Sequence, residues 1–283
     1  MMLFLYKLLT NLGEPLIRLY LLYRRLHGKE PNKRFRERLG IANKERPSGF
    51  LIWLHGASVG EAISMLPVIN QLKIEYPNAN FLVTTGTVTS SKILQSKLPN
   101  GIIHQFIPVD RLFGVQRFLD HWNPEIALWW ESEFWPNLLA STSKDIKIMS
   151  LNTSISDTSF ARLRSFKSIA NNMIKRIDLF LAQSQNTIDR LEFFGAKNTR
   201  LLGNIKINAE NYEVDLNKKA KFALSLGTSS NFKIVLGSSH DQEEEFVLNA
   251  WNQMPNSALI IAPRHPERIA SVKKMFGSIP NVV

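Results

Sequence analysis

From residue 50 onward, short apolar runs alternate with stretches that have the periodicity of amphipathic helices. We expect strands at residues 50–54, 80–85, 102–107, 125–130, 147–151, 179–183 and 199–203. Continuously apolar strands joined by crossover helices form a parallel sheet that is covered on both faces. The sequence therefore predicts a doubly wound α/β domain over residues 46–205.

A second, shorter alternation begins near residue 232. It follows a less apolar stretch at residues 206–231, which we interpret as a linker with a short helix. Only two strand–helix units fit between this point and residue 283, and sheets usually have more strands. We therefore expect residues 206–283 to form a linker and an incomplete second α/β domain.

The charge of the chain is concentrated at its N-terminus. The net charge is +11, and the first 40 residues hold nine Lys and Arg against three Glu, an excess of six. Such an excess indicates an anionic partner. Nucleic acid is not the partner we expect, because no RNA- or DNA-binding motif is present and the aromatic residues do not alternate with the basic ones. The chain has no cysteine, which excludes disulfides and thiolate metal sites.

Residues 1–23 are apolar enough to raise the question of a membrane. Their polar members Lys7, Asn11, Glu14 and Arg18 are spaced four, three and four apart, which places them on one helical stripe. A spanning helix needs ~20 apolar residues without such a stripe. We therefore expect residues 1–45 to be an amphipathic, basic segment that lies at a membrane surface, with a break near Pro15 and its basic stretch facing anionic lipid. The alternative is a partly buried helix with a solvated basic tail.

Ligands of open α/β sheets bind at the carboxyl ends of the strands, so the residues after each strand are the candidates. The first group is "HGASVGEA" (55–62), in which Ser58 and Glu61 fit the capping box of a helix N-terminus. A cap needs neither Gly56 nor Gly60, whereas close approach of a ligand to the backbone does. Glu61 is thus either a cap or a catalytic carboxylate.

Two further groups lie in the first domain. Glu131 and Glu133 of "WWESEFWPN" follow a very apolar strand, and they can bind sugar hydroxyls, shift a neighbour's pKa or cap the next helix. Thr84 and Thr85 begin the hydroxyl-rich "TTGTVTSS", which suits a polyol or a phosphate but is also typical of a capped turn.

The second domain offers residues suited to a phosphate. Ser239 and His240 lie at a strand-to-helix junction, and Arg264 follows the next strand. His240 and His265 have no carboxylate–histidine spacing around them, so we expect no metal site.

Taken together, these motifs resemble the Kdo transferases of lipopolysaccharide synthesis (3-deoxy-D-manno-octulosonic-acid transferases). "ERLG", "HGASVGEA", "TTGTVTSS", "ESEFWPNLL", "LNTSIS", "LAQS", "LGNIK", "GSSHDQEE" and "APRHPER" occur in the order of the family. The resemblance implies a GT-B fold of two Rossmann-like domains. It also implies inverting transfer of Kdo from CMP-Kdo to the lipid A precursor lipid IVA, without a cofactor or metal, at the cytoplasmic face of the bacterial inner membrane.

The resemblance also implies roles for single residues. Glu61 matches the general base that deprotonates the acceptor hydroxyl. Glu131 and Glu133 match the acidic pair before "WPN", which acts at the acceptor or donor sugar, and we group Thr84 and Thr85 with them. Ser239, His240 and Arg264 match the positions that hold CMP in the donor.

The chain departs from the family at its end, because family members continue through an "N-x-x-E-P" stretch that is missing here. We therefore expect a truncated chain: a fragment, one half of a split transferase with a separately encoded C-terminal fragment, or an inactive remnant that serves as a membrane-associated binding module. Another GT-B enzyme or a related epimerase is a further alternative, against which "SVGE" and "E-x-E-x-WPN" argue.

Overall fold

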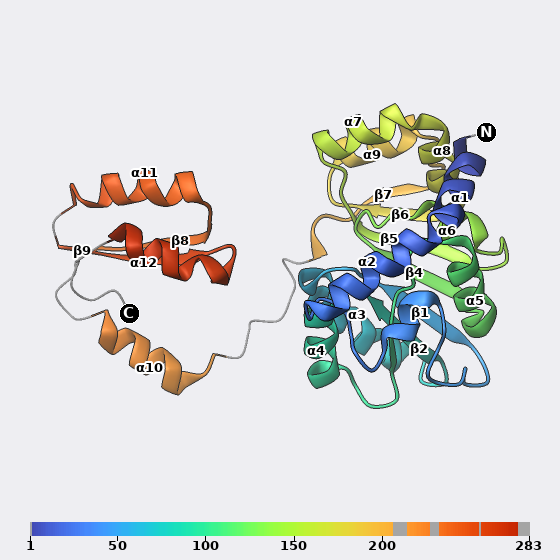
Figure 1. Cartoon of the computed structure of the whole chain (residues 1–283), viewed down its shortest axis with the longest axis horizontal. Coiled ribbons are helices and arrows are strands. Elements are labelled where there is room, and N and C mark those ends of the chain that lie inside the picture. Colours follow the sequence, from blue (N-terminus) through green and yellow to red (C-terminus); the bar gives the residue numbers. More distant parts are fainter. Residues whose placement is uncertain (1, 206–213, 227–231, 255, 277–283) are drawn as a thin grey trace. The chain divides into compact units, whose positions relative to one another are not determined.

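Seven parallel strands form the main sheet of the computed structural model (Figure 1). The structure describes residues 2–205, 214–226, 232–254 and 256–276. The chain divides into two compact units, Met1–Glu210 and Asn211–Val283, each with a sheet of its own.

The strand order in the first unit is β3-β2-β1-β4-β5-β6-β7, so the order reverses between β1 and β4. All neighbours are parallel, and the predicted strands are found within a few residues of their expected ends. The strands are β1 (Leu51–His55), β2 (Asn80–Thr85), β3 (Ile103–Phe106), β4 (Ile126–Trp130), β5 (Lys147–Thr153), β6 (Leu179–Ala182) and β7 (Thr199–Leu201). The prediction of a doubly wound α/β domain is confirmed.

The helices of this unit precede the first strand or lie between the strands. They are α1 (Met2–Leu12), α2 (Glu14–Leu26), the 3₁₀ helix η1 (Phe35–Leu39), α3 (Val59–Glu75), α4 (Val88–Lys97), α5 (Leu112–Trp122), α6 (Pro136–Ser141), α7 (Asp157–Ser165), α8 (Lys167–Arg176) and α9 (Gln185–Phe193).

The sheet has one apolar core on each face, which is why its strands are apolar without alternation. Successive residues of β4 point to opposite sides: Trp129 belongs to the core with Trp53 and Phe118, and Trp130 to the core with Met65. The rings of Trp53 and Trp129 are 4.9 Å apart and edge-on, a geometry favourable for aromatic pairs. Burial of these large side chains fixes β1 beside β4.

The edge strand β3 is covered by side chains of η1 and the residue before it. The Phe106 N–H donates to Oε2 of Glu37 at 2.7 Å, and Nη2 of Arg34 donates to the His104 carbonyl at 2.7 Å. Arg34 and Glu37 also form an ion pair of 2.7 Å. These contacts occupy backbone groups that an edge strand would otherwise expose.

A second buried carboxylate, that of Glu30, lies in the same region. Glu30 is 3% exposed and pairs with Arg24 at 2.8 Å and with Arg38 at 3.1 Å. Three of the N-terminal arginines, including Arg34, therefore bind buried carboxylates of the protein. This corrects the expectation that the whole basic stretch faces lipid. The exposed cations that remain between α2 and η1 and within η1 are Lys29, Lys33 and Arg36.

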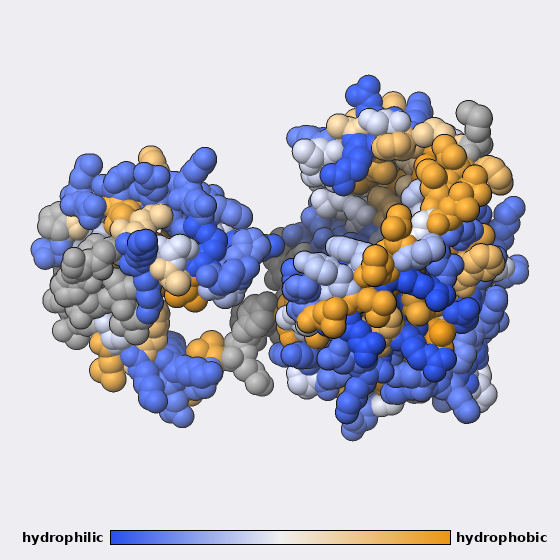
Figure 2. Space-filling model, viewed as in Figure 1, coloured by the Kyte–Doolittle hydropathy of each residue, from blue (hydrophilic) through white to orange (hydrophobic). Residues whose placement is uncertain are grey.

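The N-terminal helices α1 and α2 separate at Gly13, next to the predicted break. Polar side chains of this pair contact the unit itself: Tyr6 donates to Asp110, and Glu14 pairs with Arg111. Apart from the buried Leu21, many apolar side chains of the pair are exposed and form the stripe along α1 and α2 in Figure 2. This apolar face consists of Phe4, Leu5, Leu8, Leu9, Leu12, Leu16, Leu19, Leu22 and Leu26, which are 42–86% exposed. Within the described part of the chain, no helix has the length and hydrophobicity needed to cross a bilayer.

In the second unit, two parallel strands pair among the described residues, β8 (Phe232–Ser239) and β9 (Ser257–Pro263). Its helices are α10 (Leu216–Ser225), α11 (Asp241–Trp251), the 3₁₀ helix η3 (Pro266–Arg268) and α12 (Ile269–Phe276). The two predicted strand–helix units are thus present.

Candidate active site

The strongest candidate site lies at the carboxyl ends of β1 and β4, where the strand order of the sheet reverses. His55 at the end of β1 is in register with Trp129 of β4, so the loops that follow the two strands are neighbours. One loop leads to Glu61 and the other carries Glu131 and Glu133. Such a reversal point is the usual ligand crevice of an open α/β sheet.

Glu61 lies in the first turn of α3 and is 5% exposed. Its Oε2 accepts the Ala57 N–H at 2.8 Å, and its Oε1 accepts the Ser58 hydroxyl at 2.6 Å. The Glu61 N–H in turn donates to the Ser58 hydroxyl oxygen at 3.3 Å. The carboxylate therefore caps its own helix, and it sits at the N-terminal end of α3, where the helix dipole favours negative charge.

The packing of the Glu61 and Met65 side chains explains why residue 56 is a glycine. A Cβ at this position would lie 3.0 Å from Cβ of Glu61 and 3.1 Å from Cε of Met65. The glycine is needed so that the Glu61 side chain can fold back over the turn. Close approach of a ligand is not required to explain it.

Glu131 and Glu133 bring two more carboxylates to this edge. Glu131 has a φ of +55°, a left-handed conformation that is uncommon for a residue other than glycine and that clusters at functional sites. Oε2 of Glu133 accepts the indole N–H of Trp135 at 2.7 Å. Burial raises the pKa of Glu133, the Trp135 hydrogen bond opposes this, and the charges of Glu61 and Glu131 raise the pKa further. The structure thus joins the three glutamates into one electrostatic cluster.

His55 is a component of this site that the sequence interpretation missed. Its ring is fully buried, edge-on to Trp135 at 5.6 Å and to Trp129 at 5.9 Å, and its Nδ1 lies 3.0 Å from the Thr84 hydroxyl. Burial lowers the pKa of His55 to about 4, so the ring is neutral at pH 7. In the sequence, only its position at the end of a strand could have pointed to His55, because the residues that it contacts are distant in the chain.

Thr84 and Thr85 are not at the surface of the site. Both are fully buried in β2, where Thr84 accepts the indole N–H of Trp53 at 2.8 Å and Thr85 pairs with Nε2 of His104 at 2.9 Å. The expectation that they bind the acceptor is therefore not supported by their positions. The reason is that the strand continues through both residues and the turn begins only at Gly86.

The predicted donor residues gather at one end of the sheet of the second unit. The Arg264 N–H donates to the Ser239 carbonyl at 3.0 Å, and the rings of His240 and His265 are 6.3 Å apart. The Ser239 hydroxyl is buried, however, and donates to Glu244 at 2.6 Å.

Glu244 is fully buried and also binds Arg268 at 2.9 Å, an internal ion pair that the sequence did not reveal. His240 and Arg264 are exposed. Among the described residues, no group of three or more His, Asp or Glu is arranged to hold a metal ion.

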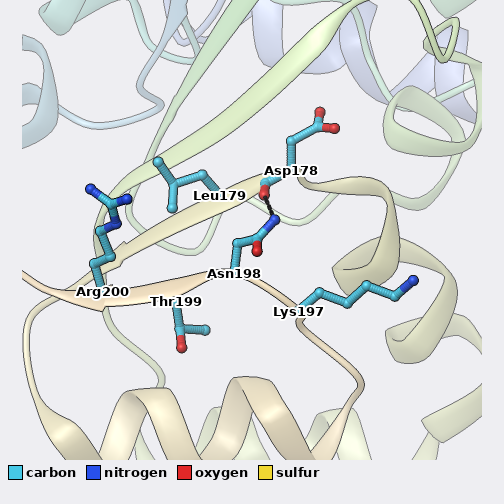
Figure 3. Close-up of a pocket in the computed structure, with 6 residues that line it drawn as sticks. All are labelled: Asp178, Leu179, Lys197, Asn198, Thr199 and Arg200. Atoms are coloured by element: carbon cyan, nitrogen blue, oxygen red, sulfur yellow. Dashed lines mark hydrogen bonds between the residues drawn. The ribbon is translucent and has the colours of Figure 1, made fainter.

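A polar hollow of about 400 Å³ lies elsewhere on the first unit (Figure 3). Asp178 and Asn198 directly precede β6 and β7, so the hollow is at the amino ends of these strands, opposite to the edge that carries Glu61. Nδ2 of Asn198 donates to the Asp178 carbonyl at 2.9 Å, and the Asp178 carboxylate accepts the Ile148 N–H. Its lining consists of Asp178, Leu179, Lys197, Asn198, Thr199 and Arg200.

Comparison with known proteins gives a consistent match in sequence. The family model described as 3-deoxy-D-manno-octulosonic-acid transferase (kdotransferase) matches residues 33–209. A 3-deoxy-D-manno-octulosonic acid transferase of Rickettsia bellii is 33% identical over 272 residues, which are 95% of this chain and 65% of the relative. The corresponding protein of Haemophilus influenzae is 29% identical over 96% of this chain and 66% of its own length. The chain thus spans about two thirds of the length of these curated relatives.

Solved structures show the same fold at low identity. The complex of MnaA from S. aureus with UDP has a TM-score of 0.57 at 13% identity and covers 82% of this chain and 68% of that one. The UDP-N-acetylglucosamine 2-epimerase of Rickettsia bellii has a TM-score of 0.54 at 14% identity and covers 83% and 69%. This likeness shows a fold of the GT-B type, as the sequence motifs imply.

Proposed function

The chain belongs to the 3-deoxy-D-manno-octulosonic-acid (Kdo) transferase family, and from this premise we propose that it transfers Kdo from CMP-Kdo to a lipid A precursor. The observation that carries the proposal is that Glu61, Glu131 and Glu133 follow the neighbouring strands β1 and β4 at the reversal point of the sheet. The transfer would proceed with inversion at the anomeric carbon, as a single displacement with one general base.

Glu61 is the proposed base. Its carboxylate oxygens accept hydrogen bonds from the Ala57 N–H and the Ser58 hydroxyl, which hold the carboxylate at the N-terminal end of α3 beside the loop that follows β1. As the acceptor oxygen forms its bond to the anomeric carbon of Kdo, its proton passes to Glu61. The bond from that carbon to the phosphate oxygen breaks at the same time, and CMP leaves with the electron pair.

The two other glutamates support this step. The negative charges of Glu61 and Glu131 disfavour ionisation of Glu133 and so favour its uptake of a proton. The raised pKa of Glu133 agrees with this role. We propose that Glu131 and Glu133 also accept hydrogen bonds from hydroxyls of the acceptor or of Kdo.

The donor phosphate is assigned to the second unit. Arg264 and His240 are exposed beside the end of β8 and can donate to phosphate oxygens. Ser239 has a supporting role, because its hydroxyl holds the buried Glu244.

The N-terminal helices support association with a membrane. A surface helix of a soluble protein usually buries its apolar side and exposes its polar side. This helix pair binds its own protein through polar side chains and exposes its leucines, and lipid is the surrounding that suits such an apolar face. Exposed Lys29, Lys33 and Arg36 add attraction to anionic headgroups. We propose that the chain lies at the cytoplasmic face of the bacterial inner membrane, where the acceptor would be presented.

The test is a transfer assay with CMP-Kdo and a tetraacylated lipid A precursor in mixed micelles, with products identified by mass spectrometry. The chain is assayed alone and together with the part of the Rickettsia bellii relative that the match does not cover. The proposal expects a product heavier by one Kdo residue, with the inverted anomeric configuration by NMR. Absence of this product in both mixtures contradicts the proposed activity, and so does transfer from a different nucleotide sugar.

A further inference from the structure

Helix α1 exposes its apolar face on one side and binds two residues of the main domain on the other. The Tyr6 hydroxyl donates to Oδ2 of Asp110 at 2.9 Å, and Nδ2 of Asn137 donates to the Thr10 hydroxyl oxygen at 3.1 Å. Asn137 is fully buried and also donates to the Asp110 carbonyl at 2.7 Å. The side of α1 that faces the domain thus belongs to one network of polar side chains.

Asp110 caps helix α6 from a distant point in the sequence. Its Oδ2 accepts the Asn137 N–H at 3.0 Å and its Oδ1 accepts the Leu138 N–H at 2.8 Å. These are among the amides that every helix leaves unsatisfied at its N-terminus, and Trp135, the residue in the cap position, supplies no side-chain bond. The first turn of α6 therefore depends on Asp110 for its anchor.

That first turn follows directly on the acidic loop of the candidate active site. Trp135 precedes α6, donates its indole N–H to Glu133 and packs its ring against His55. A shift of the α6 N-terminus moves Trp135, and Trp135 holds Glu133. The neighbour of Asp110, Arg111, pairs with Glu14 of α2 and adds a second tie to the N-terminal helices.

We infer that Tyr6 and Asp110 are positioning residues for Glu133, so that the helix with the apolar face is also a structural part of the active site. The inference rests on the proposed function, because it assigns a purpose to Glu133 within that reaction. We therefore expect the position of α1 on the domain to determine the orientation of Trp135 and Glu133, and hence the rate of the transfer step. Neither Tyr6 nor Asp110 would contact a substrate.

The test uses Tyr6→Phe in the full chain, which removes one hydroxyl and keeps the ring. Tyr76→Phe is the matched control, since Tyr76 is 55% exposed at the end of α3. The first readout is the indole N–H resonance of Trp135 in ¹⁵N-labelled protein, assigned with Trp135→Phe. The second readout is the split between kcat and the KM for CMP-Kdo.

We expect Tyr6→Phe to shift the Trp135 resonance and to lower kcat about three- to tenfold, the range for one lost hydrogen bond, with the donor KM within twofold. Asp110→Asn should shift the same resonance further, and Tyr76→Phe should change neither readout. An unmoved Trp135 resonance in Tyr6→Phe and Asp110→Asn overturns the inference, as does a loss that falls on KM alone. If the wild-type chain transfers no Kdo, the proposed function fails, while the resonance still decides whether α1 positions the loop.

Discussion

Replacement of one exposed leucine of α1 tests whether its apolar face binds lipid. Leu9 is 60% exposed in the structure. Complete burial of a leucine side chain gives about 1.5–3 kcal/mol, so transfer of the exposed part into the acyl boundary gives about 1–2 kcal/mol. We therefore expect Leu9→Asn to weaken partitioning into vesicles about 5- to 30-fold.

The assay is cosedimentation with vesicles of phosphatidylethanolamine and phosphatidylglycerol at a fixed salt concentration. Ile74→Asn is the matched control, because Ile74 is 72% exposed but lies on α3. Both substitutions should leave the free energy of unfolding in solution within about 0.5 kcal/mol, as is usual at exposed positions. Wild-type binding by Leu9→Asn would refute the reasoning, and an equal loss in Ile74→Asn would show that the binding is not specific to the apolar face.

Two predictions concern pH and charge. Burial lowers the pKa of His55 to about 4 and that of His104 to about 3. Below pH 6.5 the unfolded chain therefore binds protons that the folded chain does not. Urea unfolding at pH 5 should show a loss of about 2 kcal/mol from each of the two histidines relative to neutral pH, and a flat profile would contradict the buried neutral rings. The raised pKa of Glu133 has the opposite effect on stability. Ionisation of its carboxyl group is disfavoured in the folded chain, so the free energy of unfolding falls as the pH rises above 4.5, the value in the unfolded chain. Glu133→Gln should thus raise the free energy of unfolding at pH 7 by about 0.5–2 kcal/mol while lowering transfer activity, and equal destabilisation at pH 4 and pH 7 would count against the cluster.

The sheet was predictable because buried parallel strands have a strong local signal. Each expected strand from "FLIWL" to "TRLLG" is present, and the rule that ligands bind at carboxyl strand ends singled out Glu61, Glu131 and Glu133 as separate candidates. Their electrostatic interaction, in contrast, depends on the order of the strands, which places β1 beside β4.

The errors arose where a local pattern does not identify its partner. The spacing of Lys7, Asn11, Glu14 and Arg18 correctly predicted an amphipathic pair of helices. It could not show that the polar side binds Asp110 and Arg111, which come about a hundred residues later. The count of basic residues could not show that some are paired inside the protein. The hydroxyls of "TTGTVTSS" were assigned to a turn because the last residue of a strand cannot be located from apolar pattern alone.

The most direct test of the account is the effect of Glu61→Gln on the transfer rate and on stability in the same preparation. If Glu61 is the base, kcat should fall about 100-fold or more, while the free energy of unfolding changes by less than about 1 kcal/mol. Glu75→Gln at the opposite end of α3, where the carboxylate accepts from the exposed Gln71 amide, should retain full activity. Transfer by Glu61→Gln within a few fold of wild type, together with a loss of about 1 kcal/mol in stability, would show that Glu61 is a helix cap and no more.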